Sequence, residues 1–133
     1  MPIPMTFDRT GFILYTLHYP ECVQYYAQVL ELPKLFETDG LTCFAFGGSY
    51  LMVEFDDEHD GTTPDPSRRK SCLRMNVPDV KALADRMAAH GVAVDYQEHA
   101  WGTVAKFLDP DGNLCAFKDS EKFEQQMAQA GQR

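Results

Sequence analysis

One pattern occurs twice in this chain, and that internal repeat is the strongest constraint on its fold. Residues 11–30, an apolar strand that leads into a helix, are matched at a constant offset by residues 72–91. Residues 48–53, a glycine turn that leads into an apolar strand, are matched in the same way by residues 112–117. A repeated unit of this kind has to pack against its copy to bury its apolar face. The sequence therefore predicts two equivalent halves whose matching positions face a shared cavity.

Both halves show the same order of elements. Period-two apolar runs bounded by turn residues predict strands at 12–17, 35–38, 41–46, 50–55, 72–77, 92–96, 103–108 and 114–117. Apolar residues at helical spacing predict helices at 20–30, 78–90 and 119–130. The Asp39-Gly40 and Gly47-Gly48 pairs are hairpin signals between the strands of the first half. The predicted fold class is α+β, with two βαβββ modules whose curved sheets surround a cavity.

The length of the chain and its polar middle segment predict the domain organisation. A chain of 133 residues is one domain's worth of sequence, and we expect residues 1–133 to form a single domain. The first module covers about 11–56 and the second about 71–118, and the charged, Pro- and Gly-rich segment 57–70 links them. The terminal helix at 119–130, with Ser120 as its cap, is of the kind that docks onto the domain or onto a partner subunit.

Composition excludes some partners. The net charge of −8 repels phosphate backbones, so nucleic acid is not an expected partner. An acidic surface would favour a cationic ligand, but keeping the protein in solution is the simpler explanation of this charge. No apolar run approaches the length that spans a bilayer, and the first residues lack the pattern of a signal peptide, so we expect a cytoplasmic protein without a membrane partner. The four cysteines lack CxxC spacing and are interpreted as packing residues.

Two motifs make the chain similar to a known family. One is Trp101-Gly102 followed by the sequence FLDPDGNL at 107–114, and the other is Tyr25-Tyr26 before the sequence VLELP at 29–33. Over about residues 11–118 the chain resembles the vicinal-oxygen-chelate superfamily, which includes glyoxalase I, extradiol dioxygenases, and fosfomycin- and bleomycin-resistance proteins. It is most similar to the bleomycin-resistance branch. The resemblance implies a homodimer, with modules or strands exchanged between subunits in many members.

The positions that hold a metal ion in many members of this superfamily carry unsuitable side chains here. The resemblance places a His or Gln on each first strand and a Glu on each last strand; in this chain these positions are Gly11 (or Phe12), Met52, Cys72 and Ala116. Divalent ions need oxygen or imidazole ligands, which this set lacks. Met52 and Ala116 also match each other through the internal repeat alone. We therefore predict no metal, no cofactor and no catalytic residue.

Other potential ligands are better explained by structure. His18 lies where a residue caps the first helix, and His90 lies in the last turn of the second helix, where an imidazolium complements the helix dipole. His59 belongs to the linker, and His99 precedes Trp101 with no second ligand near it in the sequence.

Strand alternation indicates what lines the cavity instead. Taking the former ligand positions as inward-facing, the inward set includes Tyr50, Met52, Glu54 and Arg74. Phe44, Phe46 and Trp101 are expected to form aromatic walls, with Trp101 as a stacking surface or a half-buried packing residue. Glu54 and Arg74 are expected to pair with each other in the empty protein, because buried charges need partners.

These observations favour binding over catalysis. The leading hypothesis is metal-independent binding and sequestration of a small molecule, antibiotic-like or bleomycin-type, flat and cationic. The alternative is a metal-dependent glyoxalase-like lyase or dioxygenase of the same superfamily that uses non-standard ligands. A third hypothesis is a domain that has lost small-molecule function and only binds other proteins.

Overall fold

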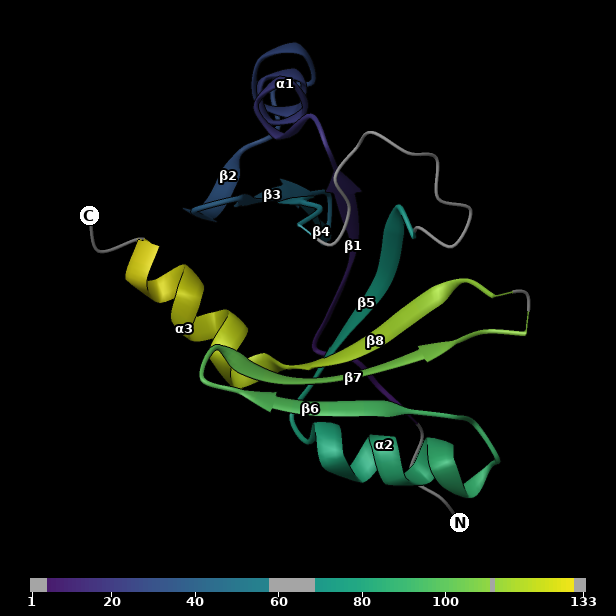
Figure 1. The fold of residues 1–133 in the computed structure, drawn as a ribbon. Coiled ribbons are helices and arrows are strands. Elements are labelled where there is room, and N and C mark those ends of the chain that lie inside the picture. The colour runs from purple at the N-terminus through teal and green to yellow at the C-terminus, as the bar shows by residue number, and fades with distance from the viewer. Residues whose placement is uncertain (1–4, 58–68, 111, 131–133) are drawn as a thin grey trace.

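The computed structural model describes residues 5–57, 69–110 and 112–130, and in them the chain folds as two βαβββ units that share one sheet (Figure 1). The first unit consists of β1 (Arg9–Thr16), α1 (Tyr19–Gln24), a π-helical turn η1 (Tyr25–Val29), β2 (Lys34–Thr38), β3 (Leu41–Phe46) and β4 (Ser49–Phe55). The second consists of β5 (Ser71–Val77), α2 (Val80–Ala89), β6 (Asp95–His99), β7 (Gly102–Leu108) and β8 (Leu114–Asp119), and α3 (Ser120–Ala130) follows it. The predicted α+β class is confirmed. Most of the predicted linker, with His59, lies outside the described residues, as does Asp111.

The sheet reproduces the repeat seen in the sequence. Its eight strands run in the order β2-β3-β4-β1-β5-β8-β7-β6; β1 pairs in parallel with β4, β5 pairs in parallel with β8, and β1 meets β5 antiparallel. The register places Ile13 beside Met52 in the first unit and Arg74 beside Ala116 in the second, which are matching positions of the repeat. A pseudo-two-fold axis therefore passes between β1 and β5.

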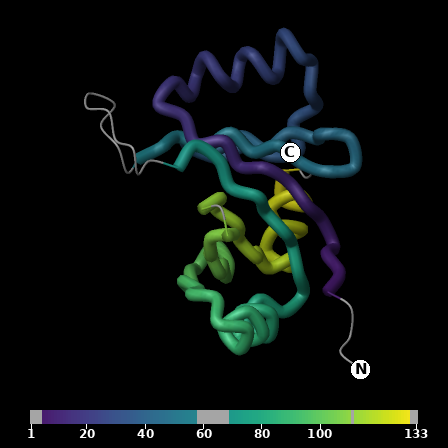
Figure 2. Tube along the Cα trace, turned by 90° about the vertical axis from the view of Figure 1, so that its right-hand side faces the viewer, coloured from purple at the N-terminus to yellow at the C-terminus, as the bar shows by residue number. Residues whose placement is uncertain are grey.

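Helices α1 and α2 each cover one unit on the same outer side of the sheet (Figures 1 and 2). The Tyr26 ring beside α1 packs on Phe44 of β3, with the ring centroids 6.2 Å apart. Val80 and Ala84 of α2 pack with Phe117 of β8 in a second core cluster. The central strands β1 and β5 lie between these two covered regions.

Helix α3 covers the opposite, inner face of the sheet. Phe123 is 1% exposed, and its ring centroid lies 4.6 Å from that of Tyr50 on β4 and 5.5 Å from that of Phe36 on β2. The sequence predicted that this helix docks, but the inner face was expected to border an open cavity. In the structure, part of that face is core, because an amphipathic helix buries its apolar stripe wherever a matching surface is available.

Two helix caps differ from expectation. Asp119, and not Ser120, caps α3, because its Oδ1 accepts the backbone N–H of Lys122 at 2.8 Å. The hydroxyl of Ser120 instead donates to Asp8. His18 stands at the N-terminus of α1, but its side chain makes no capping hydrogen bond there, while Pro20 in the first turn is as predicted.

The first helix ends differently from the predicted amphipathic helix over 20–30. From Tyr25 it widens into a π turn, in which the N–H of Leu30 donates to the carbonyl of Tyr25. An extra residue per turn rotates the following side chains away from the helix face that packs on the sheet. Val29 and Leu30, which were expected on the buried stripe, are therefore exposed.

Strand β6 begins later than the predicted strand at 92–96. Gly91 has a left-handed backbone, and the N–H of Val92 donates to the carbonyl of Met87, so the chain at this point is still closing helix α2. Val94 packs into the α2 cluster, and pairing with β7 starts only at Asp95. In the described part of the chain, none of the helices has the length and apolar character needed to cross a membrane.

Candidate ligand-binding site

The predicted inward residues share one face of the sheet. Tyr50 of β4 and Arg74 of β5 both lie level with Gly11 of β1, while Met52 lies level with Ile13. Glu54 lies one inward position further on, level with Tyr15. The register thus confirms that Tyr50, Met52, Glu54 and Arg74 face the same side, the side on which α3 docks. We call this surface of the central strands the inner face.

A tyrosine–asparagine contact crosses the inner face. Gly11 has no side chain, and the Tyr50 ring occupies the space that a side chain would fill. From there the Tyr50 hydroxyl donates to Oδ1 of Asn76, two strands away. Tyr50 and Asn76 are both 0% exposed. The contact satisfies one end of the Asn76 amide, but Nδ2 has no hydrogen-bond partner.

Arg74 is the charged centre of the inner face. It is only 9% exposed, and its Nε has no hydrogen-bond partner. Its neighbours on the adjacent strands are Gly11 and Ala116, so small residues stand on both sides of it. Buried polar groups are normally hydrogen-bonded, and leaving a charged group's donor unpaired costs free energy. Two unpaired buried donors thus stand on successive inward positions of β5.

Burial raises the pKa of the acidic and nucleophilic groups nearby. Burial raises the pKa of Glu54, and the positive charges of Arg74 and Lys106 oppose that shift. Burial likewise raises the pKa of the Cys72 thiol, although Arg74 opposes this. A thiol with a raised pKa is a poor nucleophile, so Cys72 does not have the character of a reactive cysteine.

The expected pairing of Glu54 with Arg74 is not a direct one. Arg74 is level with Gly11, whereas Glu54 is level with Tyr15, so the two residues emerge at different positions along β1. The guanidinium acts on the carboxyl through its field, which opposes the rise in the pKa of Glu54 that burial causes. Its Nε nevertheless remains without a partner.

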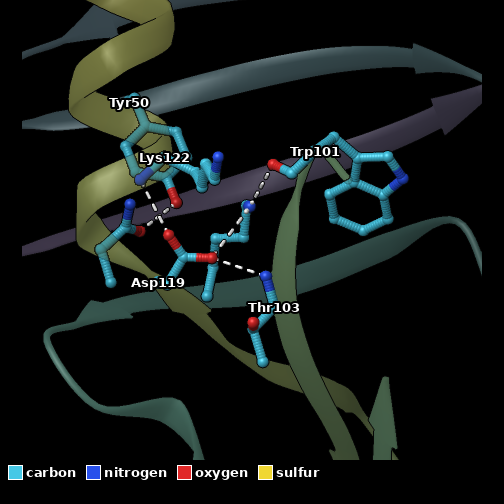
Figure 3. Close-up of polar contacts among 7 residues, drawn as sticks. Tyr50, Trp101, Thr103, Asp119 and Lys122 are labelled. Atoms are coloured by element: carbon cyan, nitrogen blue, oxygen red, sulfur yellow. Dashed lines mark hydrogen bonds and ion pairs between the residues drawn. The ribbon is translucent and has the colours of Figure 1, made fainter. Parts of the chain in front are cut away.

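Trp101 lies in the turn immediately before β7 and meets the inner face through a lysine (Figure 3). The indole ring is 52% exposed and stacks on His99 with a centroid separation of 4.4 Å. Lys118, an inward residue of β8, donates from Nζ to the Trp101 carbonyl at 3.1 Å and lies 4.8 Å from the ring centroid. Trp101 thus has a structural contact and an accessible ring: its backbone carbonyl anchors Lys118, and its ring is open to solvent.

Steric crowding explains why residue 102 of the Trp-Gly motif is a glycine. A side chain on Gly102 would overlap Nζ of Lys118 and lie 2.8 Å from a carboxylate oxygen of Asp119. The same carboxylate accepts the backbone N–H of Thr103 and that of Lys122, which ties the start of β7 to the start of α3 (Figure 3). Although burial alone would raise it, the pKa of Asp119 is lowered by these hydrogen bonds and by Lys118.

Phe44 and Phe46 do not line the inner face, which corrects the sequence prediction. In the β3–β4 hairpin, Phe44 is paired with Leu51, and Phe46 with Ser49. Both therefore point to the outer side, where Phe44 is buried beneath Tyr26 and Phe46 is 47% exposed. The two-residue Gly47-Gly48 turn could have predicted this direction. Such a turn pairs even-numbered residues of one strand with odd-numbered residues of the other.

The inner face is positively charged although the chain as a whole is acidic. Besides Arg74, the register places three cations and two carboxyl groups at inward positions of the strands: Arg9, Lys106, Lys118, Glu54 and Asp95. Arg9 pairs with Glu124 of α3 at 2.7 Å. The balance of charge on this face therefore differs from that of the whole chain.

The donor set does not fit the metal ion that the fold implies. Inward positions of the four central strands carry Gly11, Met52, Cys72 and Ala116, which supply one thiol and no imidazole or carboxylate. Within residues 5–57, 69–110 and 112–130, no group of three or more His, Cys, Asp or Glu side chains is placed to hold a metal ion. Hard divalent cations require several oxygen or nitrogen ligands.

Three contributors to this face were not among the predicted ligand-binding residues. Strand alternation in the sequence already places Asn76 on this face with Arg74, and it could also have indicated Tyr15, which lies level with Glu54. Phe123 could not be placed this way, because a helix that follows the last strand has no register with the sheet. Its spacing to Met127 indicated only that the helix has an apolar side.

Two βαβββ units that share one sheet, with a site on its inner face, define the structural class of this protein. The model of the Glyoxalase/Bleomycin resistance protein/Dioxygenase superfamily matches residues 6–117, and the chain is a member of that superfamily. This confirms the resemblance at the level of the superfamily. No curated protein matches the chain.

Solved structures show the same fold at low sequence identity. One is an NAD-dependent benzaldehyde dehydrogenase from Legionella pneumophila, with a TM-score of 0.69 and 13% identity over 83% of this chain and 97% of that one. Another is a superfamily member from Vibrio splendidus, with a TM-score of 0.60 and 20% identity over 84% and 98%. A third is a hypothetical protein from Bacillus halodurans, with a TM-score of 0.64 and 14% identity over 86% and 94%. Likeness at these identities establishes the fold and leaves function to the site.

Proposed function

We propose that this protein binds and sequesters a small molecule on its inner face without using a metal ion. The observation that carries the proposal is the replacement of a metal-ligand set by Gly11, Met52, Cys72 and Ala116 around a buried arginine with a free donor. Such a surface holds a guest through shape, hydrogen bonds and charge. It offers no activated nucleophile, because burial raises the pKa of Cys72.

The proposal includes the narrower features expected from the sequence. Binding without bond breaking resembles the action of bleomycin-resistance proteins, and a flat ligand finds an exposed aromatic surface in the stacked rings of Trp101 and His99. Glu54 is an inward carboxyl of the central strands that a cationic part of a ligand would meet. We further propose a cytoplasmic homodimer with two equivalent sites, which size-exclusion chromatography with light scattering tests directly.

The proposal is tested by titration calorimetry and thermal-shift assays. The panel consists of bleomycin-type compounds and flat aromatic molecules that carry positive, negative or no charge. We expect saturable binding with one site per chain, and we expect each bound compound to be recovered chemically unchanged by mass spectrometry. No heat and no thermal shift across the whole panel would defeat the proposal.

Elemental analysis separates this function from the enzymatic alternative. A metal-dependent lyase or dioxygenase with non-standard ligands would retain Ni, Zn, Fe or Mn in stoichiometric amount after purification. The proposed binding protein keeps its ligand affinity after treatment with a chelator, since the site has no metal to lose. A loss of binding on chelation, restored by one of these metals, would favour the enzyme.

A further inference from the structure

We infer that the ligand presents a carboxylate to Arg74 and Asn76 on the inner face. This inference rests on the proposed function and names the chemical class of its ligand. The two residues occupy successive inward positions of β5, so their side chains project from the same strand to the same side. Each has a buried nitrogen donor without a partner.

The surroundings of Arg74 are those of a ligand-binding arginine and differ from those of an arginine in a structural ion pair. The buried Nε donor of Arg74 has no hydrogen-bond partner, and an unpaired buried donor costs free energy in the empty protein. Gly11 and Ala116 on the neighbouring strands leave the positions beside it without long side chains. The planar guanidinium can therefore meet a planar carboxylate through two parallel hydrogen bonds.

Asn76 is oriented by Tyr50 for donation. Because the Tyr50 hydroxyl donates to Oδ1, the amide oxygen is already engaged and Nδ2 is the end left for a ligand. A ligand group at Nδ2 must consequently be a hydrogen-bond acceptor. An acceptor that satisfies Asn76 and also neutralises Arg74 is an anionic oxygen group, and a carboxylate has the required shape.

The surroundings of the pair favour an anion and leave it a route to solvent. The inner face carries the cations Arg9, Lys106 and Lys118 in addition to Arg74, against two inward carboxyls of the strands, Glu54 and Asp95. Arg9 is paired with Glu124 of α3, so the cations left beside Arg74 are the two lysines. Tyr15, Glu54 and Lys106 are each only partly buried. Tyr15 and Glu54 lie at the end of the face away from Asn76, so a ligand that enters there meets Arg74 first and reaches Asn76 behind it.

Two probes of equal shape and opposite charge test the inference. These are 2-naphthoate and 2-naphthamidine, titrated into the full-length protein by calorimetry at low salt. We expect the carboxylate to bind and the amidine to bind at least tenfold more weakly. In parallel, the Nε–H resonance of Arg74, assigned by its loss in R74K, should shift on addition of naphthoate.

The variants Asn76→Asp and Arg74→Met identify the donors. Asn76→Asp keeps the acceptor for Tyr50 and replaces the free donor by an acceptor, so naphthoate affinity should fall about 10- to 100-fold, the range for a hydrogen bond to a charged group. Lys81→Met is the control for Arg74→Met: it also removes one positive charge, but from the exposed α2 pair with Asp85. It should change naphthoate affinity less than about twofold, because exposed charges are strongly screened.

The outcomes separate this inference from the function on which it rests. If the amidine binds more tightly than naphthoate, the carboxylate inference is wrong while small-molecule binding stands. If naphthoate binds but the Arg74 resonance does not move and Asn76→Asp binds equally well, the carboxylate is held elsewhere and the inference is again wrong. If nothing in the wider panel binds, both fail. Should Arg74→Met or Asn76→Asp not fold, the resonance shift of the unmodified protein decides alone.

Discussion

The ring of Tyr50 lies so close to Gly11 that a side-chain carbon on residue 11 would be 2.5 Å from its Cδ2 atom. This contact lets the Tyr50 hydroxyl reach Asn76 across the sheet. The absence of a side chain at one position thus determines which donors stay free at another. Glycine at position 11, which the sequence analysis treated as a missing metal ligand, is a positive feature of the site.

Gly11→Ala should destabilise the protein by roughly 1–3 kcal/mol, the usual range for overpacking a core, because Tyr50 must move. It should also weaken ligand binding by freeing the Asn76 amide to rotate. The control is Gly48→Ala, where a new carbon would meet nothing within 4 Å. Urea unfolding measures both variants, and equal stability of the two would show that the Tyr50 ring adjusts at no cost.

Phe123→Ala should cost about 3–5 kcal/mol, as expected for truncating a fully buried aromatic residue. The loss would uncover Tyr50 and Phe36 and should release α3 from the inner face. Phe55→Ala, at a side chain that is 45% exposed, is the matched control and should cost less than Phe123→Ala, about 1 kcal/mol. Hydrogen exchange of the α3 amides provides the check, because fast exchange in Phe123→Ala alone is the expected pattern.

Replacing Glu54 with Gln should stabilise the protein at neutral pH and should leave its stability in acid nearly unchanged. Burial raises the pKa of Glu54 above its unfolded value of about 4.3, so the folded state disfavours the charged carboxylate. The resulting cost is absent below that pH and grows as pH rises through the folded pKa. Urea unfolding from pH 3.5 to 7 should show the advantage of Glu54→Gln appearing with rising pH. The exposed Glu31→Gln should show no such trend.

Gly102→Ala should cost roughly 2–4 kcal/mol, since it combines overpacking with a strained backbone. Gly102 has φ +140°, and a side chain there would overlap the Lys118 ammonium group. Gly91→Ala is the control for backbone strain alone, because φ is also positive there and the space is open. In a double-mutant cycle with Lys118→Met, the two substitutions should couple by about 1 kcal/mol. Strict additivity would contradict the proposed overlap.

Part of the candidate site could be predicted from the sequence, because the alternation of side chains along a strand is a local pattern. Tyr50, Met52, Glu54 and Arg74 were placed on one face from period-two spacing and the repeat, and the register confirms this grouping. The same reasoning misplaced Phe44 and Phe46, because the face of a strand also depends on the register of its neighbour. Trp101 was recognised from its motif, but its link to Lys118 is a contact between distant segments that no local pattern encodes.

By itself the sequence determined the two-unit βαβββ plan, the superfamily and the unsuitability of the metal positions, because each follows from residue types at fixed spacings along the chain. Only the tertiary structure decided that α3 covers the inner face, that Tyr50 orients Asn76, and that cations gather around Arg74 in a chain of net charge −8. These features depend on which strands are neighbours and in what register, since contacts across a sheet join residues that the sequence separates widely.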